Sequence, residues 1–241
     1  MQKLLLPVLL IAPLAAQAGT DDSWEFKITP YLWAIGIDGI TGPKGHEADI
    51  DMSFSDIFDK LDGAFIVSME ASKGAWTGWI DYTSMSLAHK AVADRVVVKA
   101  ALDQKVTDMA VGYRLEGMET IELYAGGRFV DVNTVIKAEG QGPGGNVGKV
   151  SIGDDWIDPI VGVRGTWPLS EKWNIRANAD IGGFGVGSDF AWQAAVAANY
   201  QFSERVSFLL AYRYLDMDYD DNGFVFDVVT SGPILGVSFS F

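Results

Sequence analysis

The chain has 241 residues with 49% hydrophobic side chains, no cysteine and a formal net charge of -14, from Lys+Arg 18 against Asp+Glu 32. This charge disfavours a nucleic-acid partner, because a phosphate backbone requires a basic surface. The lack of cysteine excludes disulfides, thiolate metal sites and a cysteine nucleophile.

The first 18 residues have the three parts of a secretory signal peptide. Lys3 precedes an apolar stretch, and the small residues Ala16 and Ala18 mark a cleavage site. The apolar run is shorter than the ~20 residues of a membrane-spanning helix. We therefore expect residues 1–18 to be removed and residues 19–241 to form one domain.

Alternation of polar and apolar residues begins at Trp24 and returns along the whole chain. Between Trp173 and Ile181, every second residue is apolar, while Arg176 and Asp180 lie on the opposite face. A period of two residues indicates β-strands. The predicted strands are residues 24–38, 63–72, 75–88, 95–115, 118–137, 150–167, 173–186, 189–202, 205–219 and 224–241.

Short and long connections alternate between these strands. Tight turns are predicted at residues 72–74, 116–118, 168–172 and 203–205, and longer connections at 39–62, 89–94, 139–149, 185–189 and 216–223. This asymmetry is typical of an outer-membrane barrel. The predicted fold class is all-β, a closed antiparallel transmembrane β-barrel of about ten strands. Eight or about twelve strands are alternatives, because Ile50, Met52 and Phe54 also alternate.

A short helix is predicted in the first long connection. Ser55 is a candidate N-cap, and Ile57, Phe58 and Leu61 follow at helical spacing. Two interpretations stay open: a helix that folds over or into the barrel mouth, and an amphipathic turn packed on the rim.

The solvent decides which face of each strand looks outward. A barrel in lipid has apolar residues outside and polar residues inside. Aromatic residues near the strand ends are typical of a girdle at the membrane interface. They are Trp24, Tyr31, Trp33, Trp76, Tyr113, Trp167, Trp173, Trp192, Tyr200, Tyr212 and Tyr214.

Charged residues on the predicted inner face form a candidate lumen charge network. Its members are Arg114, Arg128, Arg164, Arg176, Arg213, Glu70, Asp81, Asp108, Glu122, Asp158 and Asp180. We expect them to pair, because an unpaired buried charge is costly, and we expect small neighbouring residues to leave room for the arginines. The network is interpreted either as a plug that fills the barrel or as a narrow polar pathway whose selectivity the charges set. About ten strands is closer to the filled barrels than to the open ones, which favours the plug.

No catalytic residue, metal site or cofactor is predicted. The two histidines, His46 and His89, fall in predicted outer loops without a nucleophile motif. Asp216, Asp218 and Asp220 alternate as in a calcium-binding loop, but Asp221 stands where that loop requires glycine. We therefore prefer an acidic solvated loop to a Ca²⁺ or Mg²⁺ site.

The chain ends in "LGVSFSF", with Leu235, Val237, Phe239 and Phe241 on one face. A signal peptide, alternating strands and a C-terminal phenylalanine resemble the small outer-membrane β-barrel proteins of Gram-negative bacteria. The segments "YLWAIGIDG", "FSDIFDKLDG" and "DWIDPIVGVRG" are similar to features of barrels with an opacity-protein-like or OmpW-like general plan. The resemblance implies that the last strand is the signal read by the barrel-assembly machinery. It also implies contact with outer-membrane lipids and lipopolysaccharide.

The predicted function is that of an integral outer-membrane barrel with a structural, narrow porin-like or surface-interaction role. One alternative is an outer-membrane enzyme acting on lipid or peptide from a rim site, which substitution of His46 and His89 would inactivate. Another is a soluble periplasmic β-barrel that binds a small ligand, which membrane fractionation would reveal. The oligomeric state is left open.

Overall fold

The computed structural model of the protein describes residues 23–93, 96–140 and 147–241. The predicted signal peptide, residues 1–18, lies outside the described residues. The elements in chain order are β1 (Glu25–Trp33), β2 (Gly36–Pro43), β3 (Ala48–Met52), α1 (Phe54–Lys60), β4 (Leu61–Lys73), β5 (Trp76–Ala93), β6 (Val96–Arg114), β7 (Ile121–Gly140), β8 (Val147–Pro168), β9 (Trp173–Gly182), β10 (Phe190–Gln201), β11 (Val206–Asp221) and β12 (Phe224–Ser240).

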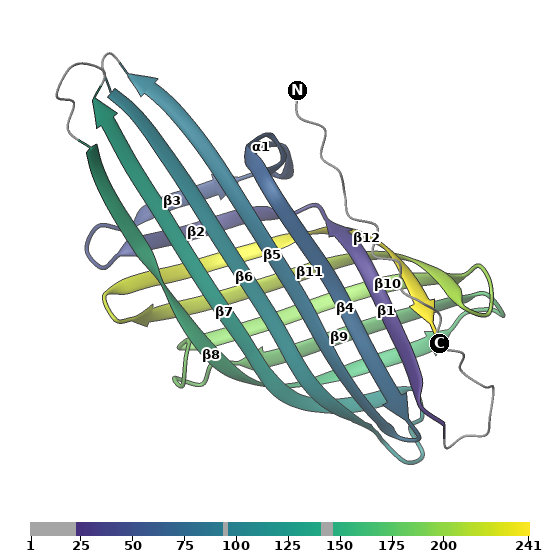
Figure 1. Cartoon of the computed structure of the whole chain (residues 1–241). Helices are drawn as coiled ribbons and strands as arrows, with labels where there is room; N and C mark the ends of the chain where they lie inside the picture. The colour runs from purple at the N-terminus through teal and green to yellow at the C-terminus, as the bar shows by residue number, and fades with distance from the viewer. Residues whose placement is uncertain (1–22, 94–95, 141–146) are drawn as a thin grey trace.

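Ten of these strands form a closed antiparallel barrel (Figure 1), which confirms the predicted fold class. β1 and β4 to β12 pair in chain order, and β12 returns to pair with β1. The backbone N–H groups of Phe26 and Phe241 each donate to the carbonyl of the other residue, at 3.3 and 2.9 Å, so the C-terminal residue completes this seam.

The hairpin of β2 and β3 is additional to the barrel strands. The first half of β12 pairs with β2, and its second half pairs with β1. The predicted first strand, residues 24–38, is therefore divided between β1 and β2. The alternation noted at Ile50 and Met52 is confirmed as the strand β3.

The connections differ at the two ends of the barrel. The predicted tight turns are confirmed, because residues 74–75, 115–120, 169–172 and 202–205 join neighbouring strands at what we call the short-turn end. Two predicted long loops are wrong where the structure describes them, because residues 89–93 and 216–221 continue strands and form a long-strand end (Figure 1). Residues 39–62 contain the end of β2, β3 and α1, and the connection predicted at 185–189 is confirmed between β9 and β10. Residues 94 and 141–146 of the predicted loops lie outside the described residues. Residues 216–221, expected to be an acidic loop, belong to β11, and Asn222 and Gly223 make the turn with positive φ angles of 52° and 76°.

Helix α1 follows β3, and its N-cap is Ser53 rather than the predicted Ser55. Ser53 and Asp56 form a capping box, in which each side chain bonds to the backbone of the other residue. Ile57 is buried in the hydrophobic core, whereas Phe54 and Phe58 are exposed. The helix therefore links β3 to β4 and lies next to β2, β3 and β5.

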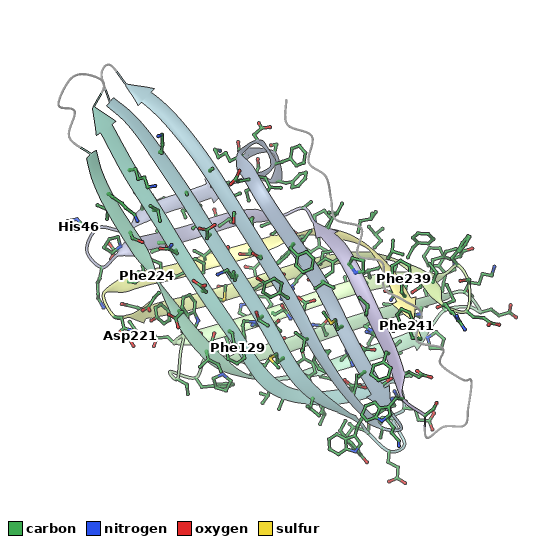
Figure 2. The ribbon with its side chains drawn as sticks, in the orientation of Figure 1. His46, Phe129, Asp221, Phe224, Phe239 and Phe241 are labelled. Atoms are coloured by element: carbon green, nitrogen blue, oxygen red, sulfur yellow. The ribbon has the colours of Figure 1, made fainter. Side chains whose placement is uncertain are left out.

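The barrel has two tiers, which differ in the side chains that they bury in the lumen: the lower tier buries charged and polar residues, and the upper tier buries apolar ones. In the lower tier, next to the short-turn end, the outward face of β8 is apolar from Ile157 to Trp167. These ten steps span about 33 Å along the strand, or about 25 Å of height at a tilt of ~40°, which matches the apolar band of an outer-membrane barrel. In the upper tier the outward residues turn polar at Asp155, while the inward Trp156 is buried. Figure 2 shows the two ends, with Phe239 and Phe241 in the lower tier and His46, Asp221 and Phe224 in the upper tier.

Candidate functional site

Five charged residues, four of them buried and Asp81 half-buried, cross the lumen as a chain in which carboxylates and guanidinium groups alternate. In order, they are Asp81, Arg213, Asp108, Arg128 and Asp180, which we call the charge belt. Every link measures 2.8 to 3.1 Å from nitrogen to oxygen. The Arg128 side chain is 0% exposed. The belt draws its residues from β5, β6, β7, β9 and β11 and so joins opposite walls of the barrel.

Neutral groups complete the ends of the charge belt. The Tyr31 hydroxyl donates to Asp81 at 2.8 Å, and the Tyr124 hydroxyl donates to Asp180 at 2.9 Å. Gln193 bridges the two halves, because its amide nitrogen donates to Asp180 while its amide oxygen accepts from Arg213. Hydrogen bonds to buried carboxylates offset the loss of water around them. The belt is therefore hydrogen-bonded along its length, although Arg128 Nη1 is buried without a hydrogen-bond partner among the described residues.

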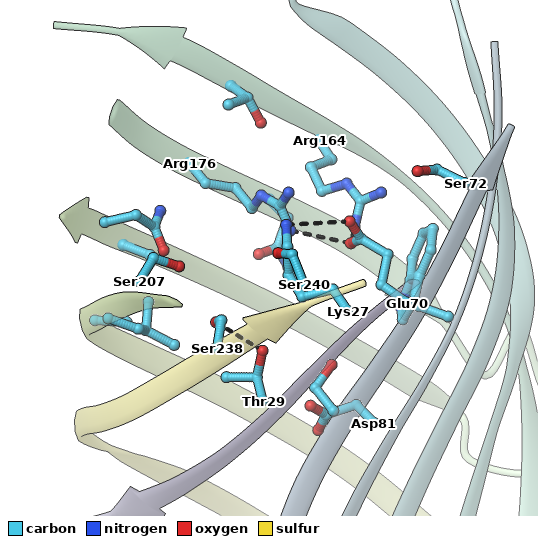
Figure 3. A pocket seen from close by; sticks show the side chains of 18 of the residues that line it. Lys27, Thr29, Glu70, Ser72, Asp81, Arg164, Arg176, Ser207, Ser238 and Ser240 are labelled. Carbon is cyan, nitrogen blue, oxygen red and sulfur yellow. Dashed lines mark hydrogen bonds and ion pairs between the residues drawn. The ribbon is translucent and has the colours of Figure 1, made fainter. Parts of the chain in front are cut away.

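A second group of charges lies between the charge belt and the short-turn end. Glu70 Oε2 accepts hydrogen bonds from Arg164 at 2.9 Å and from Arg176 at 3.0 Å (Figure 3). Lys27 Nζ lies 3.7 Å from Glu70 Oε1. Arg164 also donates to Glu122 at 2.6 Å. We call these five residues the Glu70 cluster.

Two residues of the predicted network stand apart from both groups. Arg114 is the last residue of β6, and its exposed side chain joins none of the ion pairs of the described residues. Alternation predicted an inward side chain at Arg114, but the barrel wall ends at this residue. Asp158 is fully buried, but it accepts hydrogen bonds from the Ser188 backbone at 2.7 Å and the Trp156 indole at 3.3 Å, with no ion pair in the described part of the chain.

Small residues of the lower tier do make room in the lumen, although not for the arginines next to them. A Cβ atom at Gly112 would overlap the Glu122 side chain, and one at Gly162 would overlap the Tyr124 ring. These glycines therefore accommodate a carboxylate and a phenol that hold the network in place. Lys27, Tyr31 and Gln193 were missed from the network. They lie on the inward faces of β1 and β10, two strands from which the prediction took no member, and alternation along those strands could have found them.

The girdle assignment of two aromatic residues was wrong. Tyr31 and Trp33 are 9% and 8% exposed and face the lumen. The Trp33 indole donates to the Gly232 carbonyl at 3.2 Å, and the ring lies 4.9 Å from the Arg213 guanidinium carbon. They point inward because they share the face of β1 that carries Lys27. Trp76, Tyr113, Trp167 and Trp173 are exposed at the short-turn end, where a girdle requires them.

The lumen of the upper tier is filled with apolar side chains, which corrects the expectation of a polar interior throughout. Trp156 of β8 stacks on Tyr219 with ring centroids 4.1 Å apart, and Phe226 lies 5.7 Å from the same ring. Cα atoms of β8 come within 8 Å of β2 and β12, which are not its neighbours in the sheet. The upper tier is therefore flattened, and its walls pack directly against each other.

Below the charge belt, the lumen contains a cavity of about 1020 Å³. Its lining extends from Asp81 and Asp108 in the belt, past the Glu70 cluster, to Glu204 and Phe241 at the short-turn end. The cavity walls mix charged and polar side chains with apolar ones such as Ile160 and Leu209, and the charge belt forms the inner limit. Figure 3 shows Arg164, Arg176 and Glu70 together in this space.

The other predicted sites lie at the long-strand end. His46 is exposed in the turn between β2 and β3, and the His89 side chain lies outside the described residues. Within residues 23–93, 96–140 and 147–241, no group of three or more His, Asp or Glu side chains is placed to hold a metal ion. Among the residues of the last strand, Leu235 and Phe239 are exposed on the outward face, and Val237 and Phe241 are half-buried.

None of the helices in the described ranges has the length and apolar composition needed to cross a membrane. The sequence matches no protein-family model and no curated protein.

Solved structures similar to this chain are Gram-negative outer-membrane β-barrels. The outer membrane protease OmpT from Escherichia coli has a TM-score of 0.54 and 10% identity, over 94% of this chain and 99% of that one. Ail from Yersinia pestis has a TM-score of 0.38 and 9% identity, over 91% and 99% of the two chains. Neisserial surface protein A has a TM-score of 0.33 and 11% identity, over 90% and 97%. At 10% identity the likeness to OmpT shows the fold alone, and in its fold the chain resembles this class of barrels, as predicted.

Proposed function

We propose that this protein is an outer-membrane β-barrel with a closed lumen, and that its role is structural or one of surface interaction. The observation that carries the proposal is the double closure of the lumen, by the charge belt and by the apolar packing of the upper tier. A water-filled pore requires a continuous polar path, and small barrels are filled by their own side chains. The narrow porin-like role is therefore the less favoured of the proposed roles.

The orientation follows from the connections. Outer-membrane barrels place short turns in the periplasm, so the cavity would face the periplasm and the upper tier would lie outside the cell. Outer-membrane lipids would surround the lower tier, with lipopolysaccharide next to the upper tier. The exposed Leu235 and Phe239 support recognition of the last strand by the barrel-assembly machinery. Cell fractionation tests this: wild type is expected in the outer membrane, and deletion of Phe241 is expected to lower its amount there.

Single-channel recording in a planar bilayer tests the closed lumen. We expect no discrete conductance from folded wild type, with a heat-modifiable gel band as the control for folding. Discrete wild-type conductance that Arg164→Ala changes and Arg114→Ala leaves unchanged would overturn the closed lumen and support a narrow pathway. The pair is informative because Arg164 lines the cavity and Arg114 is outside both charge groups.

We propose further that the protein is not an enzyme. Likeness to the protease OmpT is one of fold, at 10% identity. His46 is exposed at the tip of a hairpin, and its backbone N–H bonds to Pro43 at 2.8 Å. A general base requires hydrogen-bonding reach to a nucleophile or substrate. Loss of a peptide- or lipid-hydrolysing activity on substitution of His46 and His89 would contradict this proposal.

A further inference from the structure

The Glu70 cluster holds more positive than negative charge. Lys27, Arg164 and Arg176 carry three positive charges, whereas Glu70 and Glu122 carry two negative ones. The side chains of Lys27 and Arg176 are 35% and 31% exposed, and both line the cavity. Two cations therefore face the same cavity with part of their surface in contact with solvent.

Glu70 shows how this cluster binds an anion. One carboxylate oxygen accepts from two arginines at 2.9 and 3.0 Å, and the other lies 3.7 Å from a lysine. Guanidinium groups match the planar fork of a carboxylate, and bonds between two charged groups are stronger than neutral ones. A carboxylate that enters the cavity would meet the same donors, in competition with Glu70.

Besides the charged residues of the belt and of the short-turn end, the wall offers uncharged hydrogen-bonding groups. Amide and hydroxyl side chains line the cavity on strands that lie around the cluster, namely Asn174, Asn178, Asn199, Ser68, Ser207 and Ser240. The Asn199 amide donates to Asn174 at 3.0 Å, which leaves further donors and acceptors on both residues. Such groups pair with hydroxyl groups of a ligand. The volume of about 1020 Å³ is at the upper end of pockets that hold small molecules.

We propose that the cavity binds a hydroxylated carboxylate of the size of an acidic monosaccharide, with its carboxylate on Arg176 and Lys27. The inference rests on the proposed closed barrel, because the charge belt makes the cavity blind. Glu70 acts as an internal competitor that occupies the same cations when the ligand is absent. The site would thus select for negative charge and for hydroxyl groups together.

Titration calorimetry of the full-length protein refolded in detergent tests the proposal, with glucuronate as the probe. We expect glucuronate to bind and glucose, which lacks the carboxylate, to bind at least about tenfold more weakly, as expected for loss of one charge-assisted bond. Arg176→Gln is expected to weaken glucuronate binding about tenfold, and Glu70→Gln to strengthen it, because the competing carboxylate is gone. Arg114→Gln is the matched control and should leave binding unchanged.

The opposite directions of the two variants separate a binding effect from misfolding, which would lower binding in both. Absence of glucuronate binding to folded wild type and folded Glu70→Gln would overturn the proposal. So would equal binding of glucose, or tighter binding of inorganic phosphate, which shares the charge but lacks the carbon-bound hydroxyl groups. None of these results depends on conductance, so failure of the ligand site is distinguishable from failure of the closed lumen.

Discussion

Arg128 is the residue that ties the charge belt together. It donates to Asp108 at 2.8 Å and to Asp180 at 3.0 Å, and its side chain is fully buried. Replacement by methionine would leave two carboxylates without this partner, and loss of one member of a buried ion pair costs about 3–5 kcal/mol.

We therefore expect Arg128→Met to lower the free energy of unfolding by about 3 kcal/mol or more. Urea unfolding of the refolded barrel, followed by tryptophan fluorescence, measures this change. Arg114→Met is the matched control, because it removes an exposed guanidinium from the neighbouring strand, and it should change stability by less than about 0.5 kcal/mol. Equal effects of the two substitutions would show that the belt does not stabilise the barrel.

For single residues, the alternation of polar and apolar positions predicts which face of the strand carries a side chain, but not which residue that side chain contacts. Arg164 and Arg176 were placed correctly on inward faces, because each strand keeps its period of two residues. Their shared partner Glu70 lies 94 and 106 residues away in sequence. That pairing depends on how the sheet closes, and no local pattern contains it.

At the scale of a single element, the stability of helix α1 depends on its capping box. Ser53 donates to the Asp56 carboxylate through its hydroxyl and its backbone N–H, and these bonds lower the pKa of Asp56. Because the pKa is lowered in the folded state, the stabilisation is present above the ordinary pKa of aspartate. It is lost as the pH falls through the lowered value.

We expect Ser53→Ala to increase amide hydrogen exchange in α1, in line with a loss of about 1 kcal/mol from an N-cap. Ser55→Ala is the matched control, because Ser55 lies inside the helix and is not its cap. The difference between wild type and Ser53→Ala should shrink as the pH falls below the pKa of Asp56. If Ser55→Ala increased hydrogen exchange in α1 more than Ser53→Ala does, Ser55 would be the N-cap, as the sequence predicted.

Strands were predicted well where the outward face meets lipid along its length, and poorly where that face passes from lipid into water. Residues 216–221 look like an acidic loop because Asp216, Asp218 and Asp220 dominate their composition. They form a strand because the residues between them, Met217 and Tyr219, are buried in the upper tier at 0% and 2% exposure. The period of two residues was present, but the apolar face had moved from outside to inside.

For the whole molecule, the change of polarity between Asp155 and Ile157 should mark the surface of the membrane. The chain contains no cysteine, so single cysteines on the outward face of β8 report one position at a time. We expect cysteines at Ser151 and Asp155 to react quickly with a water-soluble maleimide in proteoliposomes. Cysteines at Ile157 and Val161 should be protected by lipid. Uniform reactivity along the strand would contradict the assignment of the two tiers.

Closure into ten strands was predictable for the molecule as a whole, because turn spacing and strand length are local features. The flattened upper tier was not, since it requires Trp156 of β8 to meet Tyr219 of β11 across the lumen. The sequence does contain a signal for it: Phe224, Phe226 and Val228 alternate on the inner face of β12, and the exposed Asp227 lies on the outer face between them.

The opposite polarity of the two tiers implies an order of events during biogenesis. The upper-tier hairpins contain the residues that pack around Trp156, and these can come together only after the hairpins have reached water on the far side of the bilayer. The lower tier, by contrast, gains its final state only inside lipid. Translocation of the hairpin tips must therefore precede their compaction, and the packed upper tier would then oppose movement back through the membrane. The packed upper tier, formed after the hairpins have crossed the bilayer, would thus anchor the folded protein in the membrane.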